Sequence, residues 1–249
     1  MENVKNKNIW IIGASSGIGE ALGRELASQG ANVTFSARSE DKLNDIVKSL
    51  NGNHKALPLD ASNPDEMIKA AKSIENLDCA IFLAAIYSPH SKESKDIEFV
   101  HKMFDVNVGG AFNTVNAVQP IFEEKGKGQI ILCGSVAGYR GLPYGQPYCA
   151  TKAAILNYAE SLKVELEPKN IDVKVISPGF VKTQLTDKND FPMPMIIEAE
   201  DAARAIAKGM TGNSHEIHFP KRFTYLMKLI RLLPYTLYFA IARQIREKQ

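Results

Sequence analysis

The chain has 249 residues, of which 45% are hydrophobic and 23% charged, and this balance suits one globular domain. Its formal net charge of +2 gives no electrostatic case for a nucleic-acid partner. Three cysteines without metal-ligand spacing, scattered histidines, a polar N-terminus and no apolar run of spanning length predict a reduced, cytoplasmic protein without a metal site.

Segments with strand-like and helix-like patterns alternate along the chain. We expect strands near residues 8–12, 32–36, 55–59, 79–84, 128–134, 171–177 and 215–219. We expect helices near 17–29, 40–50, 64–75, 97–124, 146–167 and 199–210. Asn63 and Pro64 mark one helix start, because asparagine caps helices and proline suits the first helical position. The alternation predicts a doubly wound Rossmann fold of class α/β, with a seven-stranded parallel sheet covered by helices on both faces. We expect one domain over residues 1–249, with a helical C-terminal extension at about 221–249.

A glycine-rich turn lies between the first expected strand and the first expected helix. Gly13, Gly17 and Gly19 follow the apolar run 9–12, and helical spacing of apolar residues begins directly after them. Strand, glycine turn and helix in this order predict a dinucleotide-binding turn. Gly13 would allow the tight turn, Gly17 would let a pyrophosphate approach the helix N-terminus, and Gly19 would let the helix pack closely. The alternative is an ordinary glycine-rich loop.

Tyr148 and Lys152 are four residues apart at the start of an expected helix, so they share one face of it. A lysine ammonium beside a phenol in a partly desolvated cleft can lower the pKa of the phenol toward neutrality. Ser135 follows the apolar run 130–134, and its hydroxyl could hold a reacting oxygen while Tyr148 transfers the proton. The alternative is a surface pair on an amphipathic helix.

Together these motifs resemble the short-chain dehydrogenase/reductase family, in its single-domain branch, from about residue 8 to about residue 183. The matching positions, in the order and spacing of the family, are Gly13, Gly17, Gly19, Asp60-Ala61, Asn107, Ser135, Tyr148, Lys152, Pro178-Gly179 and Thr183. Two positions depart from the pattern. Ile12 stands where the family usually has threonine, and Phe82-Leu83-Ala84-Ala85 stands where it usually has Asn-Asn-Ala-Gly.

The resemblance implies a role for each matching side chain. Tyr148 would be the general acid in carbonyl reduction and the base in the reverse reaction, and Lys152 would lower its pKa and bind the nicotinamide ribose. Ser135 would orient the substrate oxygen, and Asn107 would support a water relay behind Lys152. The alternative for Asn107 is a helix-interior residue bonded to backbone. The expected catalytic residues are therefore Ser135, Tyr148, Lys152 and Asn107.

The resemblance also implies a nicotinamide cofactor, with Thr183 and the backbone near Gly179 holding its amide. The expected cofactor contacts are Gly13, Ser15, Ser16, Gly17, Ile18, Gly19, Arg38, Asp60, Ala61, Ala84, Ala85, Tyr148, Lys152, Pro178, Gly179, Val181 and Thr183. Ala37 stands where an acid would bind the adenosine ribose of NAD, and Arg38 follows it. Because a guanidinium can hold a 2′-phosphate, we predict NADP(H) over NAD(H). The alternative for Arg38 is a solvated loop residue.

The substrate would be bounded by residues 136–147 and by the loop after Thr183. These segments offer Val136, Tyr139, Leu142, Pro143, Tyr144, Leu185, Phe191, Met193, Met195 and Ile196, which predict an apolar carbonyl compound or secondary alcohol. We interpret Cys133 and Cys149 as packing residues.

Residues 222–246 form a basic amphipathic segment that Pro234 interrupts. Packing, either over the substrate site or on a partner subunit, is favoured over a membrane-surface anchor. The resemblance implies a homodimer or homotetramer through the helices at 97–124 and 146–167. The favoured function is an NADP(H)-dependent oxidoreductase acting on CH–OH and C=O groups. The alternative is a catalytically silent, NADP-binding sensor or scaffold protein on the same fold; a sugar-nucleotide epimerase is disfavoured by the glycine spacing.

Overall fold

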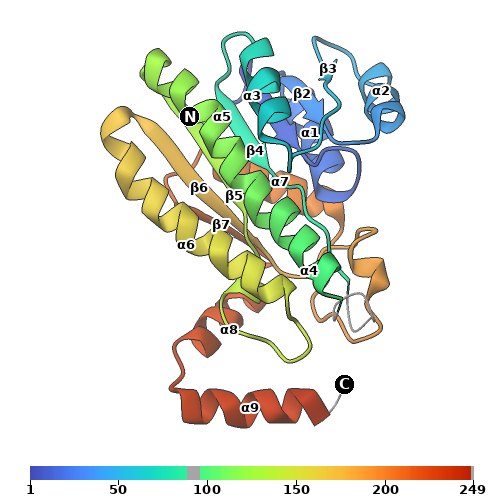
Figure 1. Ribbon diagram of the computed structural model, residues 1–249, viewed down its shortest axis with the longest axis vertical. Helices are drawn as coiled ribbons and strands as arrows, with labels where there is room; N and C mark the ends of the chain where they lie inside the picture. Colours follow the sequence, from blue (N-terminus) through green and yellow to red (C-terminus); the bar gives the residue numbers. More distant parts are fainter. Residues whose placement is uncertain (89–95, 248–249) are drawn as a thin grey trace.

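The computed structural model describes residues 1–88 and 96–247, and its named strands form one parallel sheet (Figure 1). The strands are β1 (Asn8–Ile12), β2 (Asn32–Ser36), β3 (Lys55–Ala56), β4 (Cys79–Phe82), β5 (Gly128–Cys133), β6 (Ile171–Pro178) and β7 (Glu216–Phe219). Their order across the sheet is β3-β2-β1-β4-β5-β6-β7. The chain therefore reverses its direction of winding between β1 and β4, which confirms the predicted doubly wound, seven-stranded sheet.

The helices connect and cover these strands. They are α1 (Gly17–Ser28), α2 (Glu40–Lys48), α3 (Pro64–Ser73), α4 (Ile97–Phe104), α5 (Gly110–Lys125), α6 (Tyr148–Leu166), α7 (Ala199–Met210), α8 (Lys221–Arg231) and α9 (Tyr235–Glu247). The side chain of Asn63 accepts hydrogen bonds from the backbone amides of Asp65 and Glu66, so the predicted start of α3 is confirmed. The predicted helix at 97–124 contains a π-helical segment, Asp105–Gly109, between α4 and α5.

The two faces of the sheet carry different helices because successive side chains of a strand point to opposite sides. Trp10 and Ile12 of β1 belong to the core beneath α3, α5 and α6. Ile9 and Ile11 belong to the core beneath α1, α2 and α7. All four side chains are buried, as expected for a strand covered on both faces.

The third strand is shorter than the predicted range 55–59. β3 lies at the edge of the sheet and has only β2 as a neighbour, with ladder pairing at Lys55 and Ala56. Beyond it, the backbone amides of Leu57 and Leu59 still donate to carbonyl oxygens on and after β2. The chain therefore stays beside β2 while its regular strand geometry ends.

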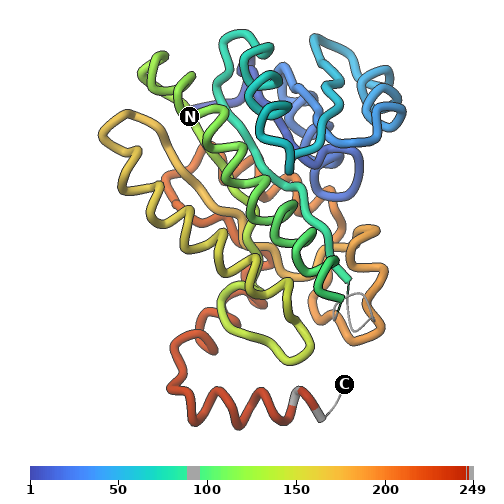
Figure 2. The backbone as a smooth tube through the Cα atoms, viewed as in Figure 1, coloured from blue at the N-terminus to red at the C-terminus, as the bar shows by residue number. Residues whose placement is uncertain are grey.

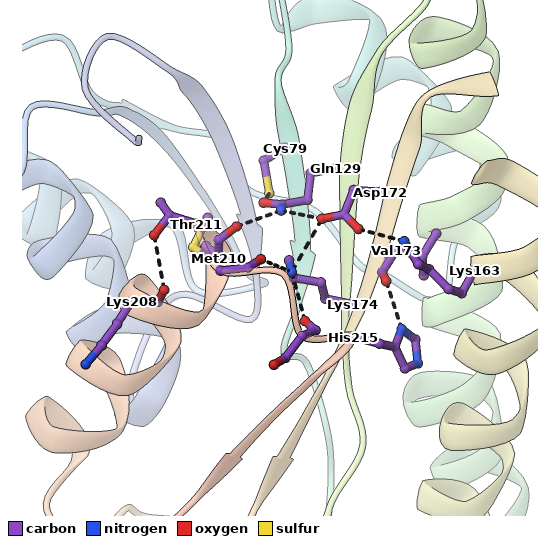
Figure 3. A network of polar contacts seen from close by, with 12 residues as sticks. Cys79, Gln129, Lys163, Asp172, Val173, Lys174, Lys208, Met210, Thr211 and His215 are labelled. Atoms are coloured by element: carbon purple, nitrogen blue, oxygen red, sulfur yellow. Dashed lines mark hydrogen bonds and ion pairs between the residues drawn. The ribbon is translucent and has the colours of Figure 1, made fainter. Parts of the chain in front are cut away.

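A polar network lies at the edge of the sheet where β4, β5 and β6 begin (Figure 3). The ammonium of Lys174, which is 1% exposed, donates to the carbonyl oxygens of Gly212 and Ser214 at 2.6 and 2.8 Å. Gln129 Nε2 donates to Asp172 Oδ2, and the same carboxylate oxygen lies 3.6 Å from Lys174 Nζ. The bonds from Lys174 fix the connection between α7 and β7 to strand β6.

The opposite edge of the sheet gathers the carboxyl ends of the central strands. Ile12 pairs with Phe82, and Phe82 pairs with Leu132, in an unbroken parallel register. The register continues from Cys133 of β5 to Ile176 of β6. The segments that follow β1, β4, β5 and β6 therefore lie side by side, and the unusual sequence after Ile81 does not disturb the sheet.

The C-terminal helices α8 and α9 lie beyond this same edge, at the lower end of Figure 2. Phe223 and Met227 bury one face of α8 in the main core, and Lys228 forms a 2.5 Å salt bridge with Glu216. α9 contacts the segment after Ser135 through Tyr238, whose hydroxyl donates to the carbonyl oxygen of Gly141. Within the described ranges, no helix is both long and apolar enough to cross a membrane.

Candidate active site

A cleft of about 460 Å³ opens at the carboxyl edge of the sheet. Its walls include all of the predicted cofactor contacts, together with Ser135. The segments after β1, β2, β3, β4, β5 and β6 all contribute to it, as does the first turn of α6. Asn107 is the one predicted site residue that does not line the cleft.

The glycine turn has the backbone geometry that its sequence predicts. Gly13 has a φ of +93°, and a Cβ atom there would lie 2.5 Å from the backbone nitrogen of Ala84. A Cβ atom on Gly19 would lie 2.1 Å from the carbonyl oxygen of Gly13. α1 can therefore begin close to the sheet only because both positions lack side chains. Ser16 is at the N-cap of α1, but its side chain accepts no hydrogen bond from that helix.

Ser135, Tyr148 and Lys152 converge on one wall of the cleft. The ammonium of Lys152 is buried; it donates to the carbonyl oxygen of Cys133 at 2.8 Å and lies 5.5 Å from the centre of the Tyr148 ring. The hydroxyl of Ser135 accepts from the backbone amide of Ala137 at 3.1 Å and also interacts with the phenol of Tyr148. The three predicted side chains are thus brought together from β5 and α6.

Burial is the largest influence on the pKa values of the titratable side chains on this wall of the cleft. It raises the pKa of Tyr148 well above the ordinary value, with further contributions from Cys133, Cys149 and Tyr87, and the hydrogen bond with Ser135 opposes it. Burial also lowers the pKa of Lys152. Burial raises the pKa of the Cys133 and Cys149 thiols, so they remain protonated at neutral pH.

Asn107 lies behind the cleft, in the π-helical segment between α4 and α5. Its Oδ1 accepts from the backbone amide of Ile86 at 2.8 Å, and its Nδ2 donates to the carbonyl oxygen of Ile86 at 3.0 Å and to Thr151 Oγ1 at 3.3 Å. The amide is thus bonded largely to backbone, which is the alternative that the sequence left open. Because Ile86 itself lines the cleft, Asn107 positions that wall.

Two cationic side chains line the cleft where α2 begins, whereas Glu40 and Asp41 of the same turn do not line it. Arg38, Ser39 and Lys42 line the cleft together, and Ser39 is at the N-cap of α2 without donating or accepting a capping bond. Partial burial opposes ionisation of Asp60, but hydrogen bonds from Ser62 and the charge of Arg38 outweigh it and lower the pKa of Asp60. The sequence analysis missed Ser39 and Lys42. The four-residue spacing from Arg38 to Lys42 at a helix start is the signal that could have indicated Lys42.

Tyr87 is a third residue that the sequence analysis missed. Its ring meets that of Tyr148 edge to face, with centroids 4.9 Å apart, and its hydroxyl donates to Asn189 Oδ1 at 2.9 Å. Tyr87 therefore connects the segment after β4 with the loop after β6, and its ring packs against Tyr148, the predicted proton donor. No motif in the sequence indicates this contact, because it depends on how two irregular segments meet.

Of the ten expected substrate-lining residues, only Leu185 lines the cleft, and Tyr144, Met195 and Ile196 are exposed. Val136 and Tyr139 are core residues, and the Tyr139 hydroxyl donates to Glu216. They are buried because Val136–Gly138 forms a short 3-10 helix that packs on α6. Besides Leu185, the apolar lining of the cleft includes Leu59, Leu83, Ile86 and Val106.

Comparison with known proteins is consistent with this geometry. The family model described as short chain dehydrogenase matches residues 7–192. An uncharacterized oxidoreductase of Myxococcus xanthus is 31% identical over 253 residues, covering 99% of this chain and 100% of its own length. One from Staphylococcus epidermidis is 35% identical over 219 residues, covering 86% of this chain and 95% of its own.

Solved structures share the fold at lower sequence identity. A short chain dehydrogenase from Burkholderia cenocepacia, in complex with NADP, superposes with a TM-score of 0.84 at 22% identity, covering 96% of this chain and 98% of its own. A short chain dehydrogenase/reductase from Burkholderia phymatum, in complex with NAD, gives a TM-score of 0.84 at 20% identity, covering 92% and 94%.

Proposed function

The chain belongs to the short-chain dehydrogenase family, and from that premise we propose that it is an NADP(H)-dependent oxidoreductase acting on an apolar carbonyl compound or secondary alcohol. One observation carries the proposal: Ser135, Tyr148 and Lys152 share a cleft with the glycine turn. A proton-transfer group and a dinucleotide cradle in one cleft are what hydride transfer at a carbonyl carbon needs.

The residues of the cleft fit a nicotinamide dinucleotide. The amides at the start of α1 lack a side-chain acceptor, and they would hold the pyrophosphate at the positive end of the helix dipole. The ammonium of Lys152 has three N–H groups, of which Cys133 takes one, so the others can bind ribose hydroxyls. Thr183 and the backbone near Gly179 would hold the nicotinamide amide. When bound, the cofactor supplies or accepts the hydride.

The chain's own part in the reaction is to place and move a proton. Ser135 would hold the substrate oxygen by a hydrogen bond, and Tyr148 would give its phenolic proton to that oxygen during reduction and take it back during oxidation. Because burial raises the pKa of Tyr148, the phenol is protonated before reduction begins. The Lys152 ammonium, once oriented by the ribose, would stabilise the phenolate that forms and so lower this pKa.

The charge at the start of α2 supports NADP(H) as the cofactor. Arg38 and Lys42 provide two cations, and the N-cap hydroxyl of Ser39 has no partner within its helix. A 2′-phosphate placed here would meet both charges and the positive end of α2. Ala37, and not an acidic residue, directly follows Ser36 at the end of β2, where NAD would need a carboxylate.

We further propose that the protein acts as a homodimer or homotetramer through α4, α5 and α6. These helices present Ile97, Phe104, Phe112 and Val164 to solvent. Phe112 stacks on Tyr158 with ring centroids 3.9 Å apart, which builds a flat aromatic surface across α5 and α6. Light scattering of the purified protein measures its mass in solution and tests this assembly.

NADPH absorbance, followed against a panel of apolar aldehydes, ketones and diketones, tests the proposed activity. We expect turnover with at least one class of substrate, and faster with NADPH than with NADH. If NADPH binds tightly but no member of the panel is reduced, the alternative of a silent, NADP-binding sensor or scaffold gains support. The complete Ser135, Tyr148 and Lys152 set argues against that alternative, since a silent protein needs none of the three.

A further inference from the structure

Exposed apolar side chains are concentrated on the two C-terminal helices. Of the fifteen large apolar side chains exposed among the described residues, eight lie on α8, on α9 or between them. They are Tyr225, Leu226, Leu229, Leu232, Tyr235, Leu237, Phe239 and Ile241. An apolar concentration of this kind usually marks an interaction surface. We call residues 221–247 the C-terminal arm.

α8 carries two apolar faces, and the fold uses only one. Phe223, Thr224 and Met227 are buried against the domain. Leu226, Leu229 and Leu232 follow one another at three-residue spacing on another side of the helix, and Leu232 is 79% exposed. Packing against the domain therefore accounts for the apolar character of Phe223 and Met227, but not for that of the three exposed leucines.

α9 contacts the rest of the chain through one buried side chain, while four of its large apolar side chains remain exposed to solvent. Its Tyr238 is buried, and the Arg140 guanidinium lies 4.7 Å from the centre of that ring and 5.0 Å from the centre of the Tyr235 ring. Arg140 also donates to the carbonyl oxygen of Leu233. Leu237 and Phe239, on either side of Tyr238 in the chain, stay exposed. The arm extends across one end of the molecule in Figure 1.

The charge of the arm differs in sign from that of the rest of the chain. The arm contains six lysines and arginines and a single acidic residue, Glu247. The remaining 222 residues contain 24 basic and 27 acidic residues, so they are net negative. Salt bridges among the described residues engage Lys228 and Arg231 but leave Lys221, Arg222 and Arg243 in solvent.

We propose that the C-terminal arm binds the surface of a membrane that contains anionic lipid. Apolar side chains flanked by unpaired cations suit the boundary between acyl chains and negative headgroups. The arm would lie in that boundary, since none of the described helices can span a bilayer. A second copy fits the arm less well, because a symmetric contact would bring two strongly basic segments together.

Sedimentation of the full-length protein with vesicles of phosphatidylcholine, with and without phosphatidylglycerol, tests the proposal. We expect binding to the vesicles that contain phosphatidylglycerol and weaker binding at high salt. Point variants are preferable to truncation, because Phe223 and Met227 belong to the core. The charge variant is Lys221→Glu with Arg222→Glu, and it should bind at least about tenfold more weakly. Its matched control is Lys69→Glu with Lys72→Glu on α3, where both lysines are exposed, and this control should bind as wild type does.

A second pair of variants tests the apolar contribution. Leu229→Asn with Leu232→Asn removes apolar surface without changing charge, and it should also weaken vesicle binding. Met195→Asn with Ile196→Asn, two exposed apolar residues outside the arm and outside the proposed subunit interface, is its control and should not. Thermal unfolding of each variant confirms that the fold is kept. The proposal is wrong if the wild-type protein stays in the supernatant, or if the charge and leucine variants bind as it does. It is also wrong if the leucine variant only changes the mass in solution, since the arm would then join copies of the chain.

Discussion

The side-chain amide of Asn107 holds both backbone groups of Ile86, accepting from its N–H and donating to its carbonyl oxygen, across 21 residues of sequence. This pair fixes the backbone at Ile86, four residues beyond the end of β4 at Phe82. The amide therefore satisfies backbone groups that lie outside the hydrogen bonds of the strand.

Replacing Asn107 with alanine should destabilise the protein by about 1–3 kcal/mol, since it removes a fully buried amide and leaves two part-buried backbone groups of Ile86 without this partner. Because Ile86 lines the cleft, the affinity for NADPH should fall as well. Urea unfolding and NADPH titration of the variant measure the two effects. Asn113→Ala removes a more exposed amide that bonds a single carbonyl, that of Ala61, and is the control for loss of an asparagine. An Asn107→Ala protein as stable as wild type would contradict the assignment.

Replacing Arg38 with glutamate should reverse the preference between NADPH and NADH. The substitution removes a cation that faces the proposed 2′-phosphate and adds a repelling charge, so we expect NADPH affinity to fall about tenfold to a hundredfold. Dissociation constants for both cofactors measure the change. Lys48→Glu, in the last turn of α2 and outside the cleft, is the matched charge control. An unchanged ratio of the two affinities in Arg38→Glu would refute the proposed role.

Replacing Tyr87 with phenylalanine tests the contact that crosses the Tyr148 ring. Burial raises the pKa of Tyr87 to about 12, so its hydroxyl stays protonated and donates to Asn189 throughout the neutral range. Without that bond, the loop after β6 should be held less firmly, and KM for the substrate should rise several-fold with little change in NADPH affinity. Steady-state kinetics of Tyr87→Phe and Asn189→Ala measure this, and the two variants should behave alike. A rise in KM with only one of the two variants would argue against a role of the Tyr87–Asn189 hydrogen bond in substrate binding.

Replacing Lys174 with methionine should affect stability alone. The ammonium bonds two carbonyl oxygens near the amino edge of the sheet, and hydrogen bonds to a charged group contribute about 1.5–3 kcal/mol. The free energy of unfolding should therefore fall by about 2 kcal/mol, while NADPH affinity remains unchanged. Denaturant unfolding and cofactor titration on one preparation separate these outcomes. Weaker NADPH binding in this variant would mean that the two edges of the sheet are coupled.

Several features of the fold could be predicted because they depend on local chemistry. Asn63 and Pro64 predict the start of α3, and the glycines at 13 and 19 predict a close approach of α1 to β1. Side-chain alternation and apolar runs predict which segments form the sheet. The i to i+4 spacing of Tyr148 and Lys152 predicts that they share a face of α6, and both line the cleft.

Features that depend on how distant segments meet could not be predicted. The role of Asn107 follows from the path of the chain after β4, and the contact of Tyr87 with Asn189 joins two loops 102 residues apart in sequence. Val136 and Tyr139 face the core because a short helix turns them there, which the apolar character of the segment does not reveal. For the same reason, apolar spacing in the C-terminal arm could not tell the buried face of α8 from the exposed one.

The proton transfer assigned to Tyr148 is the central claim, and one comparison tests it most directly. The rate of NADPH oxidation with an active carbonyl substrate is measured for wild type and for Tyr148→Phe, together with the NADPH dissociation constant of each protein. We predict that Tyr148→Phe loses at least about a hundredfold in turnover while its NADPH affinity stays within a factor of about two. A Tyr148→Phe enzyme that reduces the substrate at the wild-type rate would contradict the account.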